Sequence, residues 1–228
     1  MDVSSGSLAA LKSVEQTLSI LDAPRTHRSA TRPVVTRTFA FIDIVGSTRL
    51  IDAIGDWAWV ELLTWHEEVL GELFERHGGE LVDQAGDGWF VAFSEPAGAI
   101  ACAVEIQRVL ARYREANSRV LEVRIGLHRA GVLRCGVAYR GKGVHVAARI
   151  AGLAGAGEIL ASCDTVEASA TSITASDPRT VELAGISEPV QVQRIEWSPD
   201  ADVTKLTFAA CPRLPGPHHS SHLSTLCL

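Results

Sequence analysis

An acidic residue inside an otherwise apolar segment is the feature that most constrains how this chain can fold. Residues 38–45 read Thr-Phe-Ala-Phe-Ile-Asp-Ile-Val, a short β-branched and aromatic run that ends at the sequence Gly-Ser-Thr. This pattern predicts a buried strand. A carboxylate within a buried strand is costly unless a metal ion or a cationic partner compensates for its lost hydration. Asp43 is therefore either a ligand of a cation or an acceptor of hydrogen bonds from the turn that follows it.

Helical and strand patterns alternate along the rest of the chain. Ser47 or Thr48 is expected to cap a helix directly after the first strand. Apolar spacing predicts longer helices over 56–77, 96–113 and 144–153. Further strands are expected over 80–83, 89–93, 121–128, 158–161 and 190–195. The order βαββαβ, with its helices packed on one face of the sheet, predicts an α+β sandwich of the ferredoxin-like type.

The two ends of the chain differ in composition from this periodic region. Residues 8–21 form one weakly amphipathic helical stretch, and a segment rich in Pro, Thr, Arg and Ser follows it. The last thirty or so residues carry several prolines and a His/Ser tract. We therefore expect a flexible arm with a short helix over 1–36, one domain over 37–197 and a disordered tail over 198–228.

Charge and cysteine content narrow the classes of partner. The 228 residues include 27 acidic and 21 basic side chains, a net charge of −6, which argues against nucleic acid or an anionic membrane as the partner. Charges interrupt every apolar stretch well before the roughly 20 residues that a membrane span needs, and the first residues lack the basic region of a signal peptide. The five scattered cysteines fit a reducing compartment, so we expect a cytoplasmic protein.

A second carboxylate and a glycine-containing turn accompany Asp43. Asp87 lies within Gly86-Asp87-Gly88, where Asp-Gly is a strong signal for a tight hairpin turn. Carboxylate oxygens together with phosphate oxygens suit hard divalent cations such as Mg²⁺. The N–H groups that follow Asp43, over residues 45–48, would face an anion at a helix N-terminus. The alternative interpretation is that Asp87 is simply a favourable turn residue.

The segment 136–143 nearly matches the phosphate-binding loop pattern G-x-x-x-x-G-K-[ST]. It has Gly143 in place of the hydroxyl residue that would bind Mg²⁺, which argues against a true phosphate-binding loop. The segment is nonetheless basic and rich in glycine, and it leads into the helix expected over 144–153. Arg149 follows His145 by four residues and therefore shares a helix face with it. The alternative is a solvated arginine beside a partly buried histidine.

Taken in order, these motifs resemble the catalytic domain of class III nucleotidyl cyclases. The resemblance rests on residues 41–48 (FIDIVGST), 86–88 (GDG) and 144–149 (VHVAAR). Residues 124–128 (RIGLH) and 183–190 (LAGISEPV) are also similar to that family. The resemblance covers about residues 37–197, and the ordered set of motifs is much more specific than any single one.

The resemblance implies a reaction and a set of residues that carry it. Such domains convert ATP or GTP into the 3′,5′-cyclic nucleotide and pyrophosphate with two Mg²⁺ or Mn²⁺ ions. By position, the metal ligands would be Asp43, Asp87 and the carbonyl of Ile44. Arg149 would steady charge at the α-phosphate, and His145 stands where the ribose is oriented. The phosphate chain would lie on the N–H groups of Val45, Gly46, Ser47 and Thr48. The family builds each site from two subunits, which implies a homodimer with composite sites.

Three positions depart from the family pattern. The family usually has Asn at the position of His145, a lysine that reads adenine at the position of Asp83, and its aspartate partner at the position of Ala138. Two hypotheses remain open. The chain is either a purine nucleotide cyclase of intracellular signalling or a weak or inactive cyclase-like module that binds nucleotide or a partner chain. A ferredoxin-like RNA-binding domain is a more distant alternative that the acidic charge disfavours.

Overall fold

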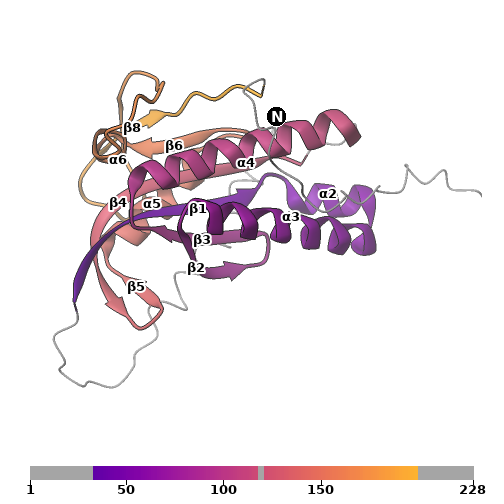
Figure 1. The fold of residues 1–228 in the computed structure, drawn as a ribbon, viewed down its shortest axis with the longest axis horizontal. Helices are drawn as coiled ribbons and strands as arrows, with labels where there is room; N and C mark the ends of the chain where they lie inside the picture. Colours follow the sequence, from indigo (N-terminus) through magenta and orange to yellow (C-terminus); the bar gives the residue numbers. More distant parts are fainter. Residues whose placement is uncertain (1–32, 118–120, 200–228) are drawn as a thin grey trace, which may run out of the picture.

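The structure, a computed structural model, describes residues 33–117 and 121–199 (Figure 1). The helix expected over 8–21 and nearly all of the tail expected from residue 198 lie outside these ranges. The boundaries predicted for the arm and the tail therefore stay predictions.

One mixed sheet of eight strands organises the described residues, in the order β2-β3-β1-β4-β6-β8-β7, with β5 paired to β4. The strands are β1 (Val34–Ile44), β2 (Gly79–Ala85), β3 (Gly88–Phe93), β4 (Val123–Cys135), β5 (Ala138–Arg140), β6 (Ile159–Ser162), β7 (Arg179–Val181) and β8 (Val190–Arg194). The helices are α2 (Ser47–Ile54), α3 (Asp56–Arg76), α4 (Pro96–Asn117), α5 (Lys142–Leu153) and α6 (Cys163–Ala168).

The first part of the domain has the predicted ferredoxin-like arrangement. Strands β2, β3, β1 and β4 are neighbours in that order, and each neighbouring pair is antiparallel. The helices α3 and α4 run side by side along one face of these strands (Figure 1). Their apolar stripes, which include Leu62, Leu73 and Leu110, bury themselves against Ile42 and Ile125 of the sheet. The α+β prediction and the packing of these two helices on one face are confirmed.

The helix α5 lies on the opposite face of the sheet, over β4 and β1. Alternate residues of β1 therefore meet different cores: Ile42 faces α3 and α4, whereas Phe39 and Phe41 face α5. Burial on both faces explains why this strand reads as a continuous apolar run. The close approach of α5 requires Gly126, because a Cβ atom there would lie 2.2 Å from the backbone nitrogen of Ala151.

Several local predictions need correction. The cap of α2 is not Ser47 or Thr48 but Gly46, which has φ of 70° and makes no side-chain capping bond. The strand expected over 121–128 is longer and forms a hairpin with β5. The stretch that resembles a phosphate-binding loop therefore becomes the end of that hairpin and the first turn of α5. The short elements β5, β7 and α6 carry no periodic signal long enough to predict.

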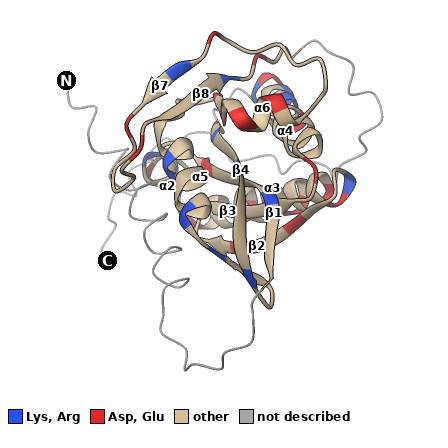
Figure 2. Ribbon diagram, turned by 90° about the vertical axis from the view of Figure 1, so that its left-hand side faces the viewer, with Lys and Arg blue, Asp and Glu red and all other residues tan. Residues whose placement is uncertain are grey.

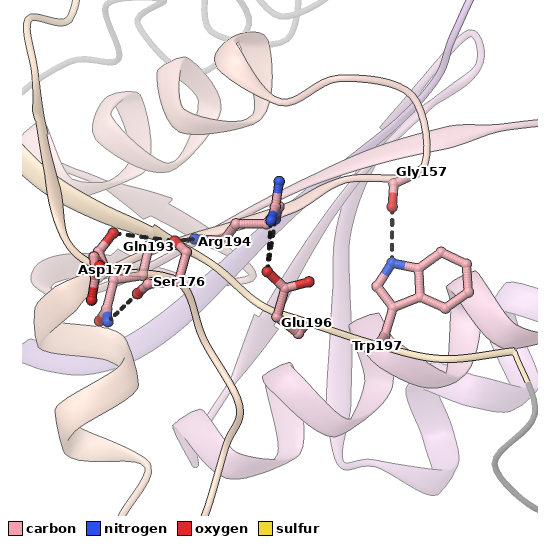
Figure 3. Close-up of polar contacts among 7 residues, drawn as sticks. All are labelled: Gly157, Ser176, Asp177, Gln193, Arg194, Glu196 and Trp197. Atoms are coloured by element: carbon pink, nitrogen blue, oxygen red, sulfur yellow. Dashed lines mark hydrogen bonds and ion pairs between the residues drawn. The ribbon is translucent and has the colours of Figure 1, made fainter.

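The far edge of the sheet is held by polar contacts (Figure 3). The indole N–H of Trp197 donates to the carbonyl of Gly157 at 2.9 Å, and the guanidinium of Arg194 pairs with Glu196 at 2.8 Å. Basic and acidic residues are interspersed over the elements seen in Figure 2. None of the helices within 33–117 and 121–199 combines the length and apolar character needed to cross a bilayer.

Candidate metal and nucleotide site

Asp43 lies near the end of β1, where the sheet register places it between two neighbouring strands. It is directly opposite Gly88 of β3 on one side and Arg124 of β4 on the other. Its side chain lies on the α5 face of the sheet, the face of Phe39 and Phe41, because side chains alternate along a strand. Only 6 % of Asp43 is exposed.

Arg124 is the cationic partner that the buried carboxylate requires. Its Nε and Nη2 atoms donate to the same oxygen of Asp43, Oδ2, at 2.9 and 2.6 Å. Arg124 is itself buried, so both partners of this ion pair are removed from water. Because both donors converge on Oδ2, the second carboxylate oxygen, Oδ1, is not used by the guanidinium.

Asp87 lies in the two-residue turn that joins β2 to β3, as predicted from Gly86-Asp87-Gly88. Gly86 adopts φ of 61°, a conformation that favours glycine and allows the tight turn. Since Gly88 is opposite Asp43, the turn brings the two aspartates to the same end of the sheet. The pKa of Asp43 is raised from 3.8 to about 6. Burial is the main cause of this rise; the Arg124 guanidinium opposes it, and the charge of Asp87 adds to it.

The start of α2 follows Asp43 directly and presents part of the expected anion cradle. The N–H of Val45 donates to the carbonyl of Glu122 at 2.8 Å, so this amide is committed to the backbone. The prediction that Val45 contributes to phosphate binding is therefore not supported by its backbone geometry. Gly46, Ser47 and Thr48 begin the helix, and none of the described side chains caps it. The first amides of this helix therefore have no intrahelical acceptor and are of the kind that can bind an anion.

His145 and Arg149 lie on α5. The buried residues of this helix include Val144, Ala148 and Ala151, which pack on the sheet. His145 and Arg149 are half-buried on the other side of the helix, one turn apart. The prediction that they share a face is consistent with this helix.

The two positions expected to read the base lie on strands that are not neighbours. Asp83 is in β2, beside a bulge between Leu81 and Asp83, and is opposite Phe90. Its Oδ1 atom accepts the N–H of Gln84 at 2.9 Å, while Oδ2 is buried without a hydrogen-bond partner among the described residues. Ala138 begins β5 and is half-buried.

Two features of the site were missed from the sequence. Arg124 belongs to the family-like motif RIGLH, and it also interrupts an apolar strand as Asp43 does. Such matched interruptions in two buried strands are a signal that could have suggested the pair. The second feature is a contact between Tyr139 of β5 and Glu80 of β2, at 2.8 Å. No sequence pattern indicates it.

The donor set suits a hard divalent cation. Two carboxylates and the carbonyl of Ile44 offer oxygen atoms, which Mg²⁺ and Mn²⁺ prefer. Burial raises the pKa of Asp43 to about 6, and a cation bound beside this carboxylate would favour its ionised form. No cluster of three or more His, Cys, Asp or Glu side chains with metal-binding geometry occurs within 33–117 and 121–199. The candidate site has only two such side chains, and its third ligand would be a backbone carbonyl.

Comparison with known proteins identifies the class. The family model of the adenylate and guanylate cyclase catalytic domain matches residues 31–194. A relative from Rhizobium meliloti (strain 1021), named "Putative adenylate cyclase 3", is 30% identical over 161 residues, which are 69% of this chain and 27% of that protein. The chain thus spans about a quarter of this relative's length.

Solved structures agree on the fold. The adenylyl cyclase CyaB from P. aeruginosa is 22% identical, with a TM-score of 0.64 over 73% of this chain and 97% of that one. A dimeric guanylyl cyclase domain of the RhoGC fusion protein from the aquatic fungus Blastocladiella emersonii is 19% identical, with a TM-score of 0.63 over 73% and 98% of the two chains. The fold is therefore that of nucleotidyl cyclase catalytic domains. The chain belongs to the adenylate and guanylate cyclase catalytic domain family.

Proposed function

We propose that this domain is a purine nucleotide cyclase, which forms a 3′,5′-cyclic nucleotide and pyrophosphate from ATP or GTP for intracellular signalling. The observation that carries the proposal is the placement of Asp43 and Asp87 at one end of the sheet, beside the uncapped start of α2. This arrangement offers oxygen ligands for cations next to amides for phosphate.

At this end of the sheet, some residues would bind the cations and others would bind the phosphate chain. Asp43, Asp87 and the Ile44 carbonyl would hold two Mg²⁺ or Mn²⁺ ions. When bound, these ions would lower the pKa of the ribose 3′-hydroxyl and balance phosphate charge. The amides at the start of α2 would orient the phosphate chain. In the reaction the ribose 3′-hydroxyl would lose its proton to solvent and its oxygen would bond to the α-phosphorus. The bond from that phosphorus to the oxygen that bridges it to the β-phosphate would break, and the β- and γ-phosphates would leave as pyrophosphate.

Arg124 is positioned to keep the Asp43 carboxylate ionised before substrate binds. Its guanidinium compensates the charge of Asp43 inside the sheet, where an unpaired carboxylate would take up a proton. Because it holds only Oδ2, it leaves the other oxygen available to a cation.

The outward side of α5 supports a composite site in a homodimer. His145 and Arg149 face away from their own sheet, so a second copy packed against α5 would receive them at its aspartates. Arg149 would then stabilise charge that develops on the α-phosphate, and His145 would donate a hydrogen bond to the ribose. A head-to-tail dimer of this kind contains two equivalent sites.

A second candidate function is a cyclase-like module that binds nucleotide or a partner chain with little or no turnover. Asp83 and Ala138 favour it, because neither can make the hydrogen bonds expected of the base-reading lysine and its aspartate partner. Misplacing the base by about 1 Å is enough to cost roughly 100-fold in rate.

One assay separates the two candidates. Purified protein is incubated with Mn²⁺ and either ATP or GTP, and cyclic nucleotide is measured by chromatography at several pH values. The enzyme predicts a cyclic product that disappears in the variant Asp43→Ala. Nucleotide binding without product at every pH supports the module instead.

A further inference from the structure

The two base-reading positions are far apart in the sheet but are connected by side chains. Asp83 is on β2, and three strands separate β2 from β5, which carries Ala138. The β4–β5 hairpin nevertheless reaches β2, because Tyr139 donates its hydroxyl to Oε2 of Glu80 at 2.8 Å. Tyr139 immediately follows Ala138, and Glu80 precedes Asp83 by three residues.

Arg134 completes this contact from the other strand of the hairpin. Its Nη2 atom donates to Oε1 of Glu80 at 3.2 Å, and its guanidinium carbon lies 5.6 Å from the centre of the Tyr139 ring. Both oxygens of Glu80 are therefore used, one by the phenol and one by the guanidinium. We call Glu80, Arg134 and Tyr139 the hairpin clamp.

The aromatic core fixes the clamp on the α5 face of the sheet. The Tyr139 ring is fully buried and packs edge-on against Phe39, with ring centres 5.4 Å apart. Burial, and then the hydrogen bond to Glu80, raise the pKa of the Tyr139 phenol, so the hydroxyl stays protonated and donates at neutral pH. The side chain of Arg37 also forms a hydrogen bond with this hydroxyl, so Glu80 and Arg37 together hold it in a defined geometry.

We propose that the hairpin clamp sets the separation between Asp83 and Ala138 and thereby determines how well the domain discriminates between purine bases. This inference rests on the proposed function, since it assigns the clamp to the base end of the same site. The clamp residues are positioning residues: they hold β5 against β2 but do not contact the base. Without the clamp the hairpin would move on the sheet and the base pocket would widen.

The test uses the full chain and compares three variants. Tyr139→Phe keeps the ring packing and removes the hydroxyl. Glu80→Gln keeps an acceptor for Tyr139 and removes the ion pair with Arg134. The double variant closes a cycle that measures their coupling. Glu196→Gln is the matched control, because it removes a surface pair with Arg194 at the far edge of the sheet (Figure 3).

For each protein, kcat and KM are measured with ATP and with GTP, together with the Mn²⁺ dependence. We expect Tyr139→Phe to raise KM for the preferred nucleotide about tenfold, because nucleotide binding must then also order the released hairpin. Its kcat should change less than about twofold, and the ratio of kcat/KM values for the two nucleotides should move toward one. Glu80→Gln should show a smaller change, and the double variant should match Tyr139→Phe within about twofold.

Other outcomes overturn the inference. An unchanged ratio in Tyr139→Phe, or an equal loss for both nucleotides, means that the clamp has a structural role alone. Thermal unfolding of each variant checks that the fold is intact.

Binding of fluorescent ATP and GTP analogues keeps the test independent of turnover. If the natural chain binds them without turnover, the dissociation constants replace KM and the same expectations apply. If it neither binds nor converts either nucleotide, the proposed function fails, and the clamp's role in base selection fails with it. If the natural chain discriminates between ATP and GTP and the variants discriminate equally well, the proposed role of the clamp is wrong while the proposed function stands.

Discussion

The two ends of the candidate site are held in place in different ways. At the metal end, Asp43 lies directly opposite Gly88 and Arg124 on strands that are its hydrogen-bonded neighbours. At the base end, Asp83 and Ala138 lie on strands that do not pair, and side-chain contacts connect them. Backbone register therefore places Asp43, whereas the proposed base pocket would depend on side-chain contacts that a single substitution can remove.

The largest effect should come from the metal end. Asp43→Ala removes a proposed metal ligand, so we expect cyclic product to fall by about 1,000-fold or more. The measurement is initial rate at saturating Mn²⁺. Asp177→Ala, which removes an exposed carboxylate near the far edge of the sheet, is the control and should keep its rate. Retention of a tenth of the activity in Asp43→Ala would contradict the proposed role of this carboxylate.

The ion pair at the metal end should control stability. Arg124→Leu leaves a buried carboxylate without its cation, and breaking such a pair costs about 3 kcal/mol. Urea denaturation at pH 7 measures this loss, and added Mn²⁺ should recover part of it, because ligand binding stabilises the folded state. Arg194→Leu, which breaks an exposed pair, should cost less than about 0.5 kcal/mol.

The same ion pair predicts a dependence on pH. The pKa of Asp43 is raised from 3.8 to about 6 in the folded state, so protonation of this carboxyl favours folding. That stabilisation is fully present below pH 3.8 and is lost as the pH rises through 6. The cost of Arg124→Leu should therefore be small near pH 4 and reach its full size above pH 6. An equal cost at pH 4 and pH 7 would show that lost packing, and not charge, explains the effect.

A smaller effect is expected at the base end. Oδ2 of Asp83 is a buried acceptor that receives no hydrogen bond from residues 33–117 or 121–199, and guanine offers N–H groups where adenine offers the acceptor N1. We expect the natural chain to prefer GTP, and the double variant Asp83→Lys with Ala138→Asp to raise the ATP-to-GTP ratio of kcat/KM about tenfold. The measurement is kcat/KM with ATP and with GTP for the natural chain and the double variant. An unchanged ATP-to-GTP ratio would mean that the purine base does not bind beside Asp83 and Ala138.

The smallest effect concerns His145. If the imidazole of His145 orients the ribose less well than an amide would, His145→Asn should raise turnover by about threefold, since the family usually has Asn at this position. Single-turnover rates at fixed Mn²⁺ measure the change. Unchanged or lower rates in the variant would count against this interpretation.

Local patterns in the sequence were sufficient for the order of elements and for the strand and turn that carry Asp43 and Asp87. The apolar run around Asp43 predicts its strand, and Gly86-Asp87-Gly88 predicts the turn, because both signals act over a few neighbouring residues. The caps and the short strands were less accessible. Gly46 replaces Ser47 as the cap of α2, and three-residue strands such as β5 are too short for a periodic signal.

The sequence by itself therefore determined the α+β class, the βαββαβ order and the two carboxylates, since these follow from local periodicity and turn chemistry. The tertiary structure alone decided which groups those carboxylates meet. Arg124 lies 81 residues from Asp43 in the chain, and Tyr139 lies 59 residues from Glu80. Contacts of that range depend on the packing of the whole sheet with α5 and the β4–β5 hairpin, and no local pattern encodes them.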